Sequence, residues 1–151
     1  MKRLLIVFII MLTLACSASA AIGTCVVTKG EWVWLRSHPS PDAEKIGTIR
    51  YGTQVDVTEI KDQFAHVRWN DKEGWADVSY FLFPQEETVY NIICDGDLNK
   101  RETPDGRWMN VIRSKRVSVL GWRYSKSGEL WAYVYHGGYV KASFLEVASA
   151  E

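Results

Sequence analysis

Histidine is the side chain best suited to bind a metal or move a proton, and this chain has three: His38, His66 and His136. A zinc site needs its ligands at a characteristic spacing. The first histidine falls in a proline-containing loop, the second on the wet face of a strand-like segment, and the third at a hairpin turn. Their spacing matches no metal motif, so we expect surface histidines, no metal and no cofactor.

Two other arrangements could support catalysis. Cys25 with a histidine could form a nucleophile and base, and the adjacent Glu86 and Glu87 could act as acid and base. Cys25, however, lies near the expected mature N-terminus, and the two acids fall in residues 83–88, a proline-containing segment typical of a solvated linker. We therefore expect no enzymatic activity, and a small cysteine hydrolase is the least favoured interpretation.

The N-terminus has the pattern of an export signal. Lys2 and Arg3 precede an apolar run over residues 4–14, and small residues end at Ala20. This is typical of a signal peptide, here residues 1–20 with a helical core, and the run is too short to span a membrane. We expect cleavage after Ala20 and a periplasmic or secreted protein without a membrane span. A lipid anchor at Cys16 is the alternative.

The charge balance argues against nucleic acid as a partner. Removing residues 1–20 leaves 16 basic and 18 acidic residues, a net charge of −2. The short basic cluster of Arg113, Lys115 and Arg116 is too small to provide a phosphate-binding surface and is interpreted as a solvated turn.

The elements that must position any site come from an internal repeat. Three pairs of segments correspond at offsets of 65, 62 and 64 residues: Arg36-Ser37-His38-Pro39 with Arg101-Glu102-Thr103-Pro104, Gln54-Val55-Asp56-Val57 with Arg116-Val117-Ser118-Val119, and Gly74-Trp75-Ala76 with Gly138-Tyr139-Val140. Each unit then closes with a one-turn aromatic segment, at Ser79-Tyr80-Phe81 and Ser143-Phe144-Leu145. We interpret the chain as a duplication of one small domain.

Within each unit the apolar residues recur every second position, as in residues 54–58 and 65–69. This period is typical of strands with one buried and one solvated face. Turn signals such as Ser40-Pro41-Asp42 and Pro104-Asp105-Gly106 separate the strands. The pattern predicts an all-β protein with about five short strands per unit, each unit a small barrel.

The combination of Leu35-Arg36, a proline-containing loop, Ile46-Gly47, Gly52-Thr53-Gln54-Val55 and Gly74-Trp75-Ala76 resembles the bacterial SH3-like (SH3b) family. The resemblance covers about residues 26–83, and the second unit is a divergent copy in which Met109 and Ser114 replace two of the glycines. It implies two tandem SH3-like barrels, residues 21–84 and 88–148. We expect Gly52 and Gly74 to adopt positive φ in tight turns, and Trp75 and Tyr139 to be buried.

Two cysteines remain after cleavage, Cys25 and Cys94. In an oxidising compartment an even pair usually bonds, and a bridge across about 70 residues would stabilise the fold by roughly 4 kcal/mol. The two positions are not equivalent in the repeat, however. We expect an intramolecular disulfide, while unpaired buried thiols and an intermolecular bond remain open.

Binding then depends on aromatic side chains and polar loops, because aromatic rings supply large contact area at low entropic cost. If Val33 and Leu35 point inward, Trp32 and Trp34 share the outer face. The candidates for ligand binding are Trp34, His38, Trp69, Trp122 and Tyr124. Packing at the junction between the units is the alternative for each ring.

Two functions compete. The first is an exported binding module for a cell-wall peptide or another envelope ligand. The second is a periplasmic protein-interaction partner, such as an inhibitor, an immunity factor or an assembly factor for a secreted enzyme. Both use a rigid shaped surface and no catalytic group.

Overall fold

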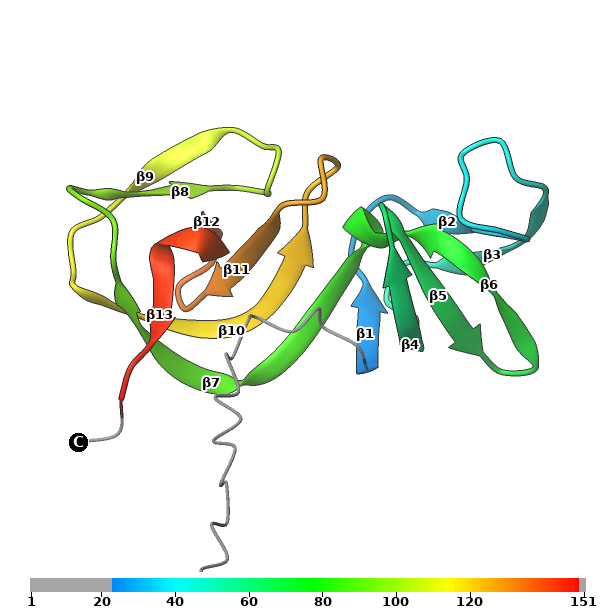
Figure 1. Ribbon diagram of the computed structural model, residues 1–151, viewed down its shortest axis with the longest axis horizontal. Coiled ribbons are helices and arrows are strands. Elements are labelled where there is room, and N and C mark those ends of the chain that lie inside the picture. The colour runs from blue at the N-terminus through cyan, green and yellow to red at the C-terminus, as the bar shows by residue number, and fades with distance from the viewer. Residues whose placement is uncertain (1–22, 150–151) are drawn as a thin grey trace, which may run out of the picture.

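The computed structural model describes residues 23–149, and these residues form two curled β-sheets that share one long strand (Figure 1). The strands are β1 (Gly23–Val27), β2 (Trp32–Arg36), β3 (Lys45–Arg50), β4 (Gln54–Lys61), β5 (Phe64–Trp69), β6 (Lys72–Asp77), β7 (Phe81–Ile92), β8 (Leu98–Arg101), β9 (Trp108–Ile112), β10 (Arg116–Tyr124), β11 (Leu130–Val134), β12 (Tyr139–Lys141) and β13 (Leu145–Val147). Two single-turn 3-10 helices, η1 (Val78–Tyr80) and η2 (Ala142–Phe144), lie at the expected closing segments. The all-β prediction is confirmed.

The predicted signal peptide, its helix and Cys16 lie outside the described residues. Within residues 23–149 the structure contains no helix with the length and apolar character needed to cross a membrane.

The first unit, residues 23–83, has the strand order β3-β2-β6-β5-β4-β1. Alternate side chains from these strands enter one core, which includes Val33, Leu35, Ile49 and Phe81. Because the strand period is two, the neighbours Trp32 and Trp34 face outward, as the sequence predicts.

The second unit, residues 84–147, has the order β9-β8-β12-β11-β10-β7, so β7 takes the place that β1 holds in the first unit. Its core is smaller and includes Leu98, Val119, Val134 and Val140. The two units also end alike. In the first, the start of β7 pairs with β1, and in the second, β13 pairs with the end of β7.

Residues 84–88 were expected to be a linker, but they lie within β7. On β10, Val119 pairs with Thr88 of β7, and Gly121, two residues later, pairs with Pro84. Residues 85–87 of β7 are therefore opposite a single residue of β10 and bulge out of the ladder. Glu86 and Glu87 are exposed there. Proline and two acids suggest a loop, yet a bulged strand accepts them equally well. The predicted domain boundaries therefore fall inside one continuous strand.

Gly52 has φ 76°, as expected, but Gly74 does not have positive φ. A Cβ at Gly74 would instead lie 2.8 Å from the carbonyl oxygen of Arg36 and 2.8 Å from Cγ of Leu35. This glycine is required because β6 approaches β2 closely, not because of a turn.

Tyr139 is buried as predicted, with 6% of its surface exposed, but Trp75 is only half-buried. In β6 the inward positions are Gly74 and Ala76, so Trp75 faces outward. There its ring lies 4.9 Å from that of His66.

The structure does not show the expected disulfide, and in it Cys25 and Cys94 are both free thiols. Cys25 lies in β1 within the first core, whereas Cys94 follows the far end of β7 and packs against the second core. A disulfide requires Cα atoms within about 7 Å, and here most of the length of β7 separates the two. The units are held together by the shared strand instead.

Candidate ligand-binding surfaces

The outer face of β2 and β3 carries two exposed tryptophans. Trp32 is 47% exposed and Trp34 is 41% exposed, and they pair with Arg50 and Thr48 on the neighbouring strand. The ammonium of Lys45 lies 4.4 Å from the centroid of the Trp34 ring, a cation–π contact. We call Trp32, Trp34 and Lys45 the aromatic face of the first unit.

The loop after β2 is held by hydrogen bonds to two of its backbone carbonyls. Arg36 donates from Nη1 to the Ala43 carbonyl at 3.0 Å, and the amide of Ser37 donates to the Glu44 carbonyl at 3.0 Å. His38 is exposed on this loop, and its Nδ1 lies 3.0 Å from Oγ of Ser37. It is available to a ligand but has no charged partner among the described side chains.

Trp69 lies at the opposite end of the first unit, at the hairpin between β5 and β6. The ring is half-buried against the first core, with the ammonium of Lys72 at 5.9 Å. It lines a shallow groove of about 340 Å³ together with side chains of β1 and β4, including Thr24 and Asp56.

Trp122 packs at the junction between the units. It contacts both cores, its Nε1 donates to Oε1 of Gln85 at 2.6 Å, and its ring meets that of Tyr90 edge to face at 5.5 Å. Tyr124 packs on the first core, edge to face with Phe83 at 6.2 Å. These two rings therefore pack at the junction between the units, the alternative given for them above. Tyr124 also lines a cleft, which is described next.

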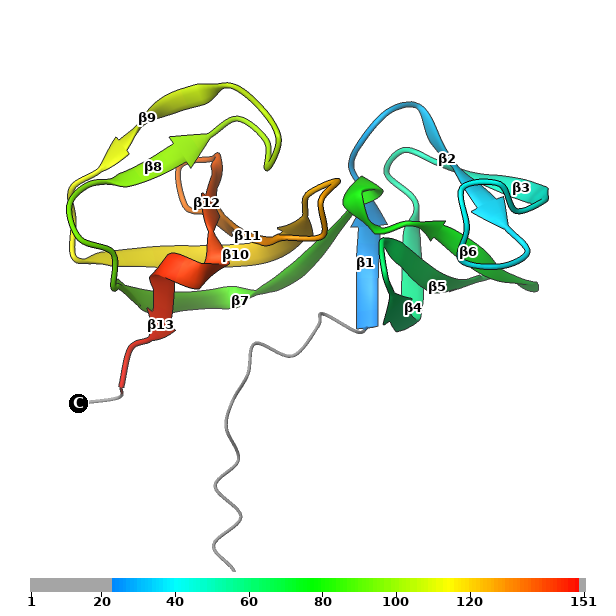
Figure 2. The same cartoon turned by 45° about the horizontal axis from the view of Figure 1, so that its top comes forward.

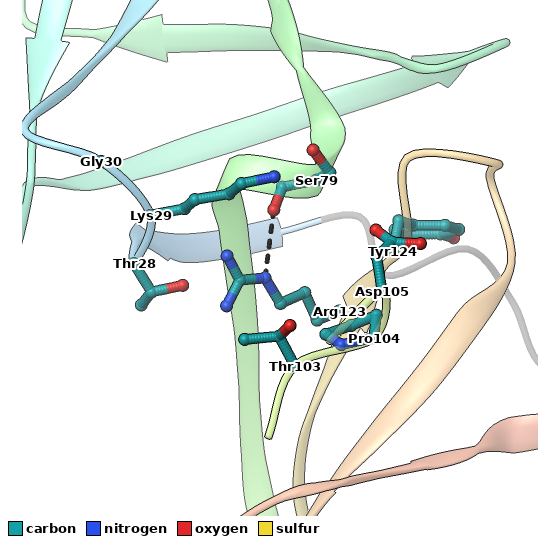
Figure 3. Close-up of a pocket in the computed structure, with 9 residues that line it drawn as sticks. All are labelled: Thr28, Lys29, Gly30, Ser79, Thr103, Pro104, Asp105, Arg123 and Tyr124. Carbon is teal, nitrogen blue, oxygen red and sulfur yellow. Dashed lines mark hydrogen bonds between the residues drawn. The ribbon is translucent and has the colours of Figure 1, made fainter. Parts of the chain in front are cut away.

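The hairpin between β10 and β11 reaches toward η1 of the first unit (Figures 1 and 2), and a cleft of about 280 Å³ lies where they meet. Four segments supply its walls, as Figure 3 shows: the residues after β1, η1, the loop after β8, and the end of β10. They are Thr28, Lys29, Gly30, Ser79, Thr103, Pro104, Asp105, Arg123 and Tyr124. We call this the junction cleft.

Arg123 forms the floor of the junction cleft. It is only 5% exposed, because alternation along β10 places it on the inward face with Val119 and Gly121. Its Nε donates to the carbonyl of Ser79 at 3.0 Å, and the guanidinium carbon lies 5.8 Å from the Tyr139 ring. No carboxylate of residues 23–149 forms an ion pair with it.

Lys29 lies above this arginine, with its ammonium 5.1 Å from the Tyr80 ring (Figure 3). Burial lowers the pKa of Lys29, and the positive charges of Lys126 and Arg123 lower it further. Asp77 and Asp105 oppose this shift. Of the charged residues that line the cleft, two are cations, Lys29 and Arg123, and one is a carboxylate, Asp105.

The sequence did not single out Lys29 or Arg123. The sequence does contain one indication of Arg123: it falls at an inward-facing position of β10, and arginine is rarely buried unless it is paired. The walls come from residues 28–30 and Ser79 of the first unit and from residues 103–105 and 123–124 of the second, so the cleft depends on how the two units pack.

The five predicted ligand-binding residues do not form one site. Trp34 and His38 belong to β2 and its loop, Trp69 to a distant hairpin, and Trp122 and Tyr124 to the junction. Among the described residues, no three histidine, cysteine, aspartate or glutamate side chains are grouped to hold a metal ion. His66 contacts Glu73 at 3.1 Å and Thr58 at 2.8 Å.

Cys25 is poorly placed to act as a nucleophile. Its side chain is fully buried, and burial, with a contribution from the negative charge of Asp56, raises its pKa to about 12. The reactive form of cysteine is the thiolate, which this environment disfavours.

Comparison with known proteins gives one family match. The model of the bacterial SH3 domain matches residues 33–81. No curated protein sequence matches the chain.

Two similar solved structures are NlpC1 and NlpC2 from Trichomonas vaginalis, with sequence identities of 16% and 13% and TM-scores of 0.38 and 0.36. The matches cover 91% and 84% of this chain and 51% and 48% of those chains, so the chain spans about half their length. The chain is therefore similar to a bacterial SH3 domain over residues 33–81, the body of the first unit.

Proposed function

We propose that this chain is an exported, non-catalytic binding module that recognises a peptide of the cell envelope, with the peptide of peptidoglycan as the first candidate. The observation that carries the proposal is the aromatic face of the SH3 domain, where Trp34 is 41% exposed beside Lys45. Large exposed rings next to a polar loop are typical of peptide-binding surfaces.

We further propose that the second unit is a divergent copy of the first. The repeated strand order supports this. The loops after β2 and β8 support it too, because each is held by an arginine: Arg36 donates to the carbonyl of Ala43, and Arg101 donates to the carbonyl of Gly106 at 2.9 Å. At the position of Trp34, however, β8 carries Asn99. The second unit exposes Trp108 there instead, and its Nε1 donates to Oδ1 of Asn99 at 3.2 Å. The arrangement of Trp32, Trp34 and Lys45 is thus a feature of the first unit.

The proposal predicts that Trp34→Ala weakens binding to purified cell wall and to soluble muropeptides by about tenfold or more, the cost typical of a central aromatic contact. Retention on cell wall and quenching of tryptophan fluorescence measure this. Trp108→Ala is the matched control, because Trp108 is 56% exposed on the other unit and should leave binding unchanged. No binding of the unaltered protein at millimolar muropeptide would exclude the envelope peptide.

A second candidate function, a protein-interaction partner for a secreted enzyme, is favoured by β9. This strand is at the end of the sheet order, and it exposes Trp108 and, at 40%, Met109. An edge strand with exposed apolar side chains can accept a strand of another protein.

Co-purification from the envelope after cell-wall digestion tests this second function. A stoichiometric protein partner that is lost on Trp108→Ala and kept on Trp34→Ala would support it. Failure to recover any partner after digestion, with binding to cell wall intact, would favour the envelope peptide.

A further inference from the structure

The guanidinium of Arg123 offers hydrogen-bond donors to the junction cleft. Only its Nε donates to a described residue, the carbonyl of Ser79. Figure 3 shows the two terminal nitrogens directed toward Thr28 and Lys29, away from that carbonyl. Arginine presents its donors in a planar fork that matches the two oxygens of a carboxylate. We propose that the junction cleft binds a carboxylate group, held by Arg123 and Lys29.

The charges around the cleft favour an anion. Two cations, Lys29 and Arg123, and one carboxylate, Asp105, line the cleft, while Lys126 and Asp77 lie near enough to affect the charge of Lys29. Both carboxylates are engaged by the protein: Asp77 accepts from the amide and hydroxyl of Ser79, and Asp105 accepts from the amide of Lys126 at 2.9 Å. A buried cation without a counter-ion is costly, and a bound carboxylate would offset that cost.

A second, independent observation is an unsatisfied hydroxyl in the wall of the cleft. Oγ1 of Thr28 is buried and has no hydrogen-bond partner among the described residues. Figure 3 shows it facing the guanidinium of Arg123. Buried polar groups are almost always paired, and an unpaired one often marks the place of a water or a ligand. An oxygen acceptor beside Arg123 would give this hydroxyl a partner.

The volume of the cleft limits what can enter. About 280 Å³ is slightly below the usual volume of small-molecule sites, roughly 300–1,000 Å³, so the cleft admits only a small acid or the end of a peptide. Pro104 and Gly30 form walls without charge, and the cleft uses no residue of the aromatic face. The inference therefore does not depend on recognition of the cell envelope.

Calorimetric titration of the whole protein tests the site with three probes. N-acetyl-alanyl-alanine carries a terminal carboxylate, its C-terminal amide has the same shape without the charge, and inorganic phosphate is a competing oxyanion. We expect the acid to bind at least about tenfold more tightly than the amide, the usual effect of losing a charged hydrogen bond. Equal binding of acid and amide, or tighter binding of phosphate, would overturn the assignment.

Lys29→Met should weaken binding of the acid by about tenfold, while Lys61→Met, a change of an exposed lysine on β4, should not. Because Arg123 is buried and its replacement could unfold the protein, its role is read in the unaltered protein from the NMR signal of its Nε–H. That signal should shift as the acid is added and stay unchanged with the amide. An Nε–H signal unmoved by saturating acid would contradict the proposal.

Discussion

At the scale of single residues, the buried thiol of Cys25 gives the structure a measurable dependence on pH. Its pKa is raised from the ordinary value of 9.0 to about 12 by burial and by the charge of Asp56. Below pH 9 the thiol is protonated in both the folded and the unfolded chain. Between pH 9 and 12 only the unfolded chain loses the proton, so the free energy of unfolding must fall as pH rises.

The fall attributable to Cys25 is about 1.4 kcal/mol for each pH unit above 9. Urea unfolding at pH 7.5 and pH 10.5, in the presence of reductant, measures it when the unaltered protein is compared with Cys25→Ala. The variant lacks the thiol, so its deficit in stability should shrink at the higher pH, whereas lysine and tyrosine titration affects both proteins alike. A deficit independent of pH would show that the thiol is not held in an apolar environment.

Residue positions that depend on alternation within one strand could be predicted from the sequence. Val33 and Leu35 point inward and Trp34 points outward, because the period of a strand is local information. Arg123 and Lys29 could not be identified as partners in the same way. Their encounter requires β10 of one unit to lie against η1 of the other, and no local pattern encodes that.

At the scale of elements, the close approach of β6 to β2 explains why residue 74 is a glycine, although Gly74 is not in a turn conformation. We predict that Gly74→Ala costs about 1–3 kcal/mol, the range for overpacking a closed core, because the new methyl group would contact Arg36 and Leu35. Gly47→Ala is the matched control, since a Cβ at Gly47 on β3 has no atom within 4 Å. Thermal unfolding measures both, and equal stabilities of the two variants would contradict the explanation.

The elements themselves were largely predictable, and the connection between them was not. Short apolar periods and turn residues predicted the strands and both closing 3-10 turns. The segment around Pro84 and Glu86 was misinterpreted because a loop and a strand bulge have the same local composition. Only the pairing of β7 with β10 on one side distinguishes them.

At the scale of the whole molecule, β7 belongs to both sheets and Trp122 contacts both cores. The two units therefore cannot separate without breaking a shared strand and removing a ring from its packing. We expect a single cooperative transition on calorimetric unfolding, in spite of two distinct cores.

Trp122→Ala should uncouple the units, because it removes the ring that spans both cores together with the hydrogen bond to Gln85. The expected result is two calorimetric transitions, with the second unit, which has the smaller core, unfolding first. Trp122→Phe keeps a ring against both cores and should retain one transition at a lower temperature. Two transitions in the unaltered protein would show that β7 transmits no coupling and that each sheet folds on its own.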